Sequence, residues 1–318
     1  MQYYKYVTEK YKNISPFIRK TPLLESAYFS RLTNNKIFFK CENLQYTNSF
    51  KVRGAFSKVI SIKDKKNKKL ISTSGGNHGL GVAFAANKFA MRAIIIVPEF
   101  VPQFRIDLIK ALNAEVIVYG KTIEAANGKA LEYIKKDPSY IYIHPFDDEE
   151  VIAGQATIAY ELLKEMPDLD IIITSVGGGG LISGVSEYAK SLNPNIVIFG
   201  TQTLGADAMS QSLSVGKIIT LPAITSIATS LGATKVAPRT FALVQKNVEL
   251  VAVVSDDEAL IELKNILAHE KLLVEPASSC NLAALRAYKF PEIKNKKIVI
   301  ILCGGNVSLP QLKTFLID

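Results

Sequence analysis

Short apolar runs alternate along the chain with segments of helical periodicity. The runs are rich in valine and isoleucine and nearly free of polar residues, which is typical of strands covered on both faces. They lie at Ala93–Pro98, Glu115–Tyr119, Tyr140–His144, Asp170–Val176, Asn195–Phe199 and Lys297–Cys303. This alternation predicts an α/β fold with mostly parallel sheets.

Helix signals stand between these runs. Apolar residues from Val52 to Ile60 recur on one helical face. Asp147–Glu150 place acidic residues in the first turn of a helix through Leu163, where they suit the helix dipole. A capping box at Ser255–Glu258 opens another predicted helix.

Composition and charge narrow the functional classes. The 318 residues are enough for about two domains, and 48% are hydrophobic against 21% charged, as in globular proteins. No apolar run approaches the roughly 18 residues of a membrane span, and the first residues lack an apolar signal core. We therefore expect a cytoplasmic protein without a membrane partner.

Two further classes fit the sequence poorly. The net charge is +9, but the lysines are scattered, and their densest run, at 63–69, has no aromatic residues for stacking on bases. The three cysteines and three histidines show no metal-ligand spacing. We expect neither a nucleic-acid partner nor a bound metal of the zinc type.

One lysine lies at the start of a predicted helix, within the sequence Asn-Ser-Phe-Lys-Val-Arg-Gly at residues 48–54. A lysine amine condenses with an aldehyde only when it is neutral, so such a lysine needs a lowered pKa. Phe50 and Val52 flank Lys51 and are consistent with partial burial. The alternative is a surface lysine at a helix start.

A run of four glycines, Gly177–Gly180, follows a predicted buried strand and precedes a helix that begins near Leu181. Glycines let the backbone approach a ligand closely, and a helix start adds positive potential, so this loop suits a phosphate. No Gly-Lys-Ser/Thr follows, which excludes a Walker A motif. The alternative is a flexible turn.

Two more loops carry candidate chemistry. Thr73–Gly79 (TSGGNHG) opens a predicted helix, where backbone N–H groups suit a carboxylate and Asn77 could donate to a ring hydroxyl. An ordinary capping turn by Ser74 or Asn77 is the alternative. The neutral thiol of Cys303, in a Cys-Gly-Gly-Asn loop, could hydrogen-bond a heterocyclic nitrogen. A buried core cysteine is the alternative there.

In order and spacing, these four segments resemble the fold-type II pyridoxal 5′-phosphate (PLP) enzymes, and specifically the serine/threonine dehydratases. Leu221–Ala228 and Glu270–Ala277 resemble the mammalian-type catabolic L-serine dehydratases in particular. The resemblance implies a tryptophan synthase β-like fold and a homodimer. It also implies a small domain at residues 42–145 and a large PLP-binding domain at residues 1–41 and 146–318.

The resemblance assigns roles by motif position. Lys51 would hold PLP as a Schiff base and then accept the Cα proton of the substrate. The cofactor-binding residues would be Lys51, Phe50, Asn77, Gly177, Gly178, Gly179, Gly180, Leu181 and Cys303. The loop around the substrate carboxylate would comprise Ser74, Gly75, Gly76, Asn77 and His78.

The implied reaction is β-elimination from L-serine or L-threonine, which gives pyruvate or 2-oxobutyrate and ammonia. Serine racemase, threonine synthase and cysteine synthase compete within the PLP enzymes, although cysteine synthases carry threonine in the phosphate loop. A regulatory protein that binds PLP or an amino acid without turnover is the non-enzymatic alternative.

Departures from related branches refine this interpretation. Racemases of the family carry a serine where this chain has Gly75, so we expect elimination with little racemisation. Their divalent-cation site corresponds to Gln202 and Ala208, with Asp207 offset, so we expect no divalent metal. A monovalent cation held by backbone carbonyls stays open.

Two positions toward the end of the chain complete the expectations. Glu275 precedes Pro276 at a predicted helix start, where it either supports the site or is simply a favourable N-terminal carboxylate. The chain ends at Asp318, without the regulatory extension of biosynthetic threonine deaminases, so we expect no isoleucine feedback through such a domain.

Overall fold

The larger of two sheets has six strands in the order β1-β2-β10-β7-β8-β9. The computed structural model describes residues 3–65 and 67–317. All neighbouring strands of this sheet are parallel except β1 and β2. The strands are β1 (Leu23–Ser26), β2 (Lys36–Lys40), β7 (Ile171–Ser175), β8 (Val197–Thr203), β9 (Leu250–Val254) and β10 (Lys297–Ile301).

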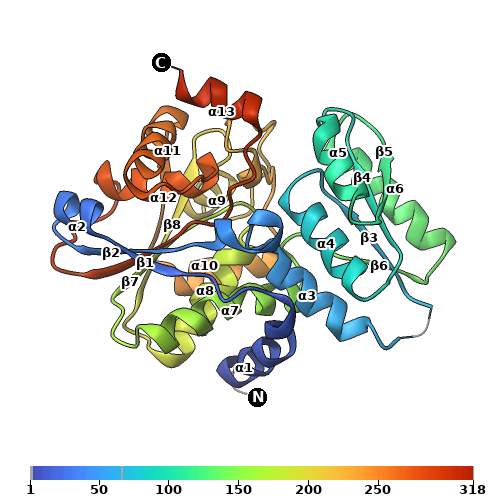
Figure 1. The fold of residues 1–318 in the computed structure, drawn as a ribbon, viewed down its shortest axis with the longest axis horizontal. Helices are drawn as coiled ribbons and strands as arrows, with labels where there is room; N and C mark the ends of the chain where they lie inside the picture. The colour runs from blue at the N-terminus through green and yellow to red at the C-terminus, as the bar shows by residue number, and fades with distance from the viewer. Residues whose placement is uncertain (1–2, 66, 318) are drawn as a thin grey trace.

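The smaller sheet has four parallel strands in the order β5-β4-β3-β6. Its strands are β3 (Lys69–Thr73), β4 (Ala93–Val97), β5 (Glu115–Val118) and β6 (Tyr140–Tyr142). Figure 1 shows this sheet, with α4, α5 and α6, as one lobe beside the lobe of the larger sheet. The predicted α/β fold with mostly parallel sheets is confirmed.

Helices cover both sheets. The α-helices are α1 (Tyr3–Ile14), α2 (Ala27–Thr33), α3 (Lys51–Ile62), α4 (Asn77–Lys88), α5 (Gln103–Lys110), α6 (Ile123–Lys136), α7 (Glu149–Glu165), α8 (Gly180–Leu192), α9 (Ala208–Ser214), α10 (Pro238–Asn247), α11 (Asp256–Glu270), α12 (Pro276–Arg286) and α13 (Leu309–Leu316). The short 3₁₀ helices are η1 (Ser15–Phe17), η2 (Glu42–Leu44), η3 (Tyr46–Asn48) and η4 (Thr229–Leu231).

Two predicted helix starts are confirmed: the acidic first turn of α7 and the capping box of α11. The Asp148 side chain accepts hydrogen bonds from the Glu150 and Val151 N–H groups at the start of α7. Ser255 and Glu258 form both bonds of the capping box at the start of α11. These caps satisfy backbone N–H groups that have no partner within the helix.

Helix α3 lies between the two lobes and packs on α7 (Figure 1). At the crossing, an added Cβ on Gly154 would lie 2.5 Å from the Cα of Gly54. Only glycine at both positions allows the two backbones to approach this closely. The crossing fixes α3, which begins at Lys51, against the larger lobe.

The predicted domain boundaries at residues 41/42 and 145/146 stay a prediction, although all four strands of the smaller sheet fall between them. Residues 1–2 and 318, at the ends of the predicted large domain, lie outside the described residues. Within the described part of the chain, no helix is both long enough and apolar enough to cross a membrane.

Candidate active site

Three loops meet at the carboxyl ends of parallel strands. The loop of Ser74–Gly76 follows β3, the glycine run follows β7, and Cys303 follows β10. In open α/β sheets, ligands bind outside the carboxyl ends of the strands. The sheet topology thus gathers the segments that the sequence singled out.

Lys51 is the first residue of α3 and is half-buried. Its Nζ donates a hydrogen bond to the carbonyl oxygen of Pro145 at 2.9 Å and lies 5.1 Å from the centre of the Phe50 ring. Burial lowers the pKa of Lys51 to about 8, although Cys303 and Glu275 act in the opposite direction. A substantial fraction of this amine is therefore neutral at mildly alkaline pH.

Cys303 is held beside Lys51 by the backbone. The Phe50 N–H donates to the Cys303 carbonyl oxygen at 3.1 Å, and Ser49 pairs with Gly304 in an isolated antiparallel bridge. The Cys303 thiol is buried and lies 3.3 Å from the hydroxyl oxygen of Ser278. Burial, with a further contribution from Glu275, raises the pKa of Cys303 to about 11. The group facing this site is thus a neutral thiol at physiological pH.

The glycine run has no space for side chains. An added Cβ on Gly178 would lie 2.2 Å from the ring of Phe146, and one on Gly180 would lie 2.9 Å from the same residue. An added Cβ on Gly179 would lie 2.8 Å from Thr240. Gly179 also has φ of +94°, which L side chains rarely adopt.

The glycine run leads directly into α8, whose start carries no side-chain cap. Its first backbone N–H groups have no partner within the helix, and the helix dipole makes this end positive. Leu181 is buried in the core below and anchors the first turn. Uncapped N–H groups behind a loop without side chains form a site suited to a phosphate.

The loop before α4 is packed just as tightly. An added Cβ on Gly75 would lie 2.3 and 2.5 Å from the two γ carbons of Val101. The Gly76 N–H donates to the hydroxyl oxygen of Ser74 at 3.2 Å, and an added Cβ on Gly76 would lie 3.1 Å from Arg105. Arg105 places a guanidinium beside this loop that sequence reasoning did not select.

Glu275 supports the loop instead of capping its own helix. No side-chain bond from Glu275 caps α12. Its carboxylate accepts from Asn77 Nδ2 and from the Asn306 N–H, both at 2.9 Å, and from the Ser230 hydroxyl. The sequence left two interpretations of Glu275, and the structure favours the one in which it supports the site. Asn77 is further fixed by a bond of 2.7 Å from Asn306 Nδ2 to its Oδ1.

The His78 side chain is buried and held by the backbone. Its Nε2 lies 3.0 Å from the carbonyl oxygen of Ile143, and the residue is almost wholly buried. Burial, with the nearby Lys51 charge, lowers the pKa of His78 to about 3. The imidazole is therefore neutral, and only the backbone of His78 is available to a substrate carboxylate.

Neither position compared with a divalent-cation site carries a carboxylate, because one is the amide of Gln202 and the other is the methyl group of Ala208. Gln202 Nε2 donates to the carbonyl oxygens of Val176 and Ala206, at 2.9 and 3.0 Å. Asp207, directly before α9, accepts from Gln211 Nε2 of that helix. Among the described residues, no group of three or more His, Cys, Asp or Glu side chains could hold a metal ion.

The structure thus brings Lys51, Phe50, Asn77 and Cys303 into one neighbourhood, with backbone or side-chain contacts linking them. Sequence reasoning missed the residues that close this neighbourhood, which are Pro145, Phe146, Arg105, Ser230 and Ser278. Pro145 and Phe146 immediately follow a predicted strand, which indicates a position near a ligand but not which groups they contact.

A model of the pyridoxal-phosphate dependent enzyme family matches residues 14–304. The chain belongs to this family, whose members use pyridoxal phosphate. Within it, the chain has the fold of the fold-type II enzymes, with serine/threonine dehydratases and serine racemases among its relatives.

Individual relatives cover nearly the whole chain. A serine racemase from Dictyostelium discoideum is 38% identical, over 98% of this chain and 97% of its own. An L-threonine ammonia-lyase from Thermotoga maritima is 34% identical, over 96% of this chain and 76% of its own. The structure of a processed threonine deaminase from Solanum lycopersicum has a TM-score of 0.92 at 31% identity, covering 99% of this chain and 92% of that one.

The residues present fit the cofactor of this family. A phosphate suits the uncapped start of α8, where side chains on the glycines would fill the space. A lysine with a lowered pKa suits an aldehyde, and a neutral thiol suits a pyridine nitrogen that carries no proton.

Proposed function

We propose that this protein is a PLP-dependent ammonia-lyase that converts L-serine, L-threonine or both to pyruvate or 2-oxobutyrate and ammonia. One observation favours elimination over racemisation: Val101 occupies the space that a side chain at residue 75 would need. Racemisation needs a group that returns a proton to Cα from the side opposite the lysine. Gly75 has no such group, and Val101 leaves no space for one.

Each residue of the site has a role in this proposal. When bound, the cofactor supplies a sink for the electrons left on Cα. Lys51 would hold the cofactor through its aldehyde, and the neutral Nζ of Lys51 would accept the Cα proton of the substrate. The backbone N–H groups of Gly177–Gly180 would bind the phosphate, and the Cys303 thiol would meet the ring nitrogen. Asn77 Nδ2 has a second hydrogen, beyond the one given to Glu275, for the ring hydroxyl.

The substrate carboxylate is bound by the loop from Ser74 to His78. Its backbone N–H groups lie at the start of α4, which no side chain caps. Arg105 beside this loop adds a positive charge that suits the same carboxylate. The loop thereby orients the amino acid so that its Cα proton can face Lys51.

Serine racemase is the second candidate, because the Dictyostelium relative of that name is 38% identical along almost the full length. A regulatory protein that binds PLP without turnover is a third. A homodimer stays a prediction from the resemblance. A cytoplasmic location stays a prediction from the hydropathy and the first residues of the sequence, and a bound monovalent cation stays open.

Purified protein incubated with L-serine or L-threonine is expected to release keto acid and ammonia in equal amounts. D-serine should form from L-serine at least about 10²-fold more slowly than pyruvate, since a positioned acid–base group contributes about 10²–10⁴-fold. Chiral chromatography and a keto-acid assay measure the two products. The additional methyl of threonine is worth only about 1–3 kcal/mol, so both substrates need assay.

The double variant Gly75→Ser/Val101→Ala tests the carrying observation. It removes the two γ carbons that would collide with a side chain at residue 75, so D-serine formation should rise by about tenfold or more. Val101→Ala alone is the matched control and should not gain racemisation. Racemisation by the unaltered chain at a rate rivalling elimination would refute the proposal and favour the racemase.

Loading of the cofactor should depend on pH in a defined direction. Full-length protein freed of PLP should rebind it faster as pH rises through about 8, because only the neutral Lys51 amine reacts. Each pH unit below that midpoint lowers the neutral fraction about tenfold. Stopped-flow absorbance gives the midpoint. A value near 10.5, the ordinary value for lysine, would show that burial does not activate this amine.

A further inference from the structure

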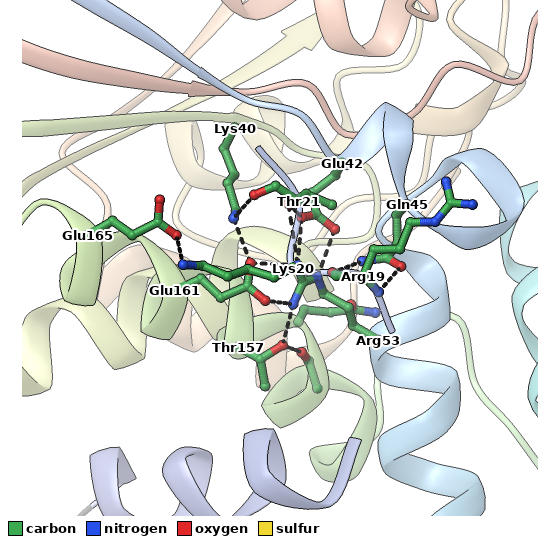
Figure 2. Close-up of polar contacts among 12 residues, drawn as sticks. Arg19, Lys20, Thr21, Lys40, Glu42, Gln45, Arg53, Thr157, Glu161 and Glu165 are labelled. Carbon is green, nitrogen blue, oxygen red and sulfur yellow. Dashed lines mark hydrogen bonds and ion pairs between the residues drawn. The ribbon is translucent and has the colours of Figure 1, made fainter. Parts of the chain in front are cut away.

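Four charged side chains form a buried cluster behind the start of α3. Lys40, Glu42, Arg53 and Glu161, called here the charge cluster, come from β2, η2, α3 and α7 (Figure 2). None is more than 2% exposed. Two positive and two negative groups make the charge cluster neutral.

Arg53 is the centre of this cluster and bonds both carboxylates with its planar fork. Its Nε and Nη2 donate to the two oxygens of Glu42, each at 2.8 Å. Its Nη1 and Nη2 donate to the two oxygens of Glu161, each at 2.9 Å. Lys40 Nζ donates to Glu161 Oε2 at 2.6 Å. Two bidentate contacts fix the guanidinium in position as well as orientation.

The electrostatics show how tightly the charge cluster is matched. Burial opposes the charge on Arg53, but Glu42 and Glu161 together raise the pKa of Arg53 above its ordinary value. Burial likewise opposes the charge on Glu161, yet Arg53 and Lys40 hold the pKa of Glu161 low. Apolar residues of similar volume often stabilise a core as well as buried ion pairs do. Stability alone therefore gives little reason for such a cluster at this place.

The place in the fold supplies a reason. Arg53 follows Lys51 by two residues in the first turn of α3, so the two side chains point about 200° apart around the helix axis. Lys51 faces the site while Arg53 faces the charge cluster. No side chain caps α3, so its first turn lacks the usual protection against fraying.

We propose that Arg53 is a positioning residue, which through Glu42 and Glu161 clamps the first turn of α3 to the larger lobe and thereby holds Lys51 at the site. This inference rests on the proposed role of Lys51. Because β2, η2 and α7 all contribute partners, the first turn of α3 belongs mechanically with the six-stranded sheet and its helices.

Arg53→Lys in the holoenzyme is the most direct test. It keeps the positive charge but replaces the fork with a single ammonium that cannot bond both carboxylates in the same way. Hydrogen exchange of the backbone in residues 51–56 should accelerate at least about tenfold, while exchange in α8 stays unchanged. The kcat on the accepted substrate should fall about tenfold with KM within about twofold, because a displaced Lys51 accepts the proton less well while the contacts that bind the substrate remain.

Two further variants separate positioning from general stability. Lys20→Met removes an exposed ion pair to Glu165 on the same helix α7, and it should leave both readouts at the values of the unaltered protein (Figure 2). Arg53→Met/Glu42→Gln keeps the remaining buried pair neutral and should recover melting temperature relative to Arg53→Met alone. It should not recover the exchange rate at 51–56 or kcat, because the clamp is still absent.

The outcomes distinguish this inference from the proposed function. If Arg53→Lys leaves exchange at 51–56 unchanged, or accelerates it equally in all helices, the clamp is refuted and the charge cluster is merely structural. If the clamp is present but no pyridoxyl group is found on Lys51, the inference about α3 holds and the proposed function fails.

Discussion

Replacement of Lys51 by alanine is expected to remove both the covalent cofactor and the turnover of the enzyme. The amine of Lys51 is the proposed partner of the cofactor aldehyde and the proposed acceptor of the Cα proton, so one substitution deletes both roles. Loss of the base alone lowers kcat by about 10²–10⁴-fold. The measurement is borohydride reduction and digestion, followed by the mass of the peptide containing residue 51.

The matched control is Lys63→Ala, at the other end of α3. Lys63 directly follows the last residue of the helix, and its side chain is 38% exposed. That variant should retain the pyridoxyl group on residue 51 and the activity of the unaltered protein. Turnover that persists in Lys51→Ala, or a pyridoxyl mass on a different lysine, would overturn the assignment of the site.

The strand pattern was predicted for six strands, including β5, whose residues are only half-buried or exposed, whereas the largely buried β3 and β9 were missed. All five residues of β4 are buried and apolar, and the run Ala93–Pro98 identified it from sequence. Strands β1 and β2 gave no such signal. β1 is an antiparallel strand at the sheet edge with exposed positions, and β2 begins and ends with lysine. Such short polar-ended strands depend on tertiary pairing more than on their own composition.

The charge cluster could not be predicted from the sequence, because it too depends on tertiary contacts. A charged side chain is almost never fully buried unless it is paired, so Lys40 and Arg53 would be expected at the surface. Arg53 bonds Glu42, 11 residues away, but Lys40 and Arg53 both also depend on Glu161, which lies 121 and 108 residues away in the chain. The sequence contains no local signal for partners at such separation.

The candidate site likewise contains residues that could be predicted from the sequence and residues that could not. The glycine run and Lys51 could be predicted because their chemistry depends on the backbone and on one amine, both of which lie within short motifs. The contribution of Phe146 could not, because it depends on how the loop after β6 crosses the glycine run. Likewise, Glu275 reaches Asn77 across 198 residues of chain, and only the fold brings them together.

A side chain added to the glycine run is expected to weaken PLP binding strongly, because the Phe146 ring packs directly against Gly178. Gly178→Ala would place a Cβ 2.2 to 2.4 Å from three ring carbons of Phe146, and the ring itself must move since its attachment carbon is among them. Overpacking of this kind costs about 1–3 kcal/mol, and here it also displaces the loop proposed to bind the phosphate. We expect the affinity for PLP to fall about 10²-fold, as measured by titrating PLP into the full-length protein.

Gly128→Ala is the matched control, because nothing lies within 4 Å of an added Cβ there and the residue is in the middle of α6. That substitution should keep the affinity for PLP and raise stability by about 0.4–1 kcal/mol. Adding Phe146→Ala to Gly178→Ala removes the collision and should restore much of the lost affinity. A methyl group at residue 178 cannot fit against Phe146 unless the N–H groups of the glycine run move. If Gly178→Ala nevertheless binds PLP as tightly as Gly128→Ala does, the phosphate is not held by the glycine run.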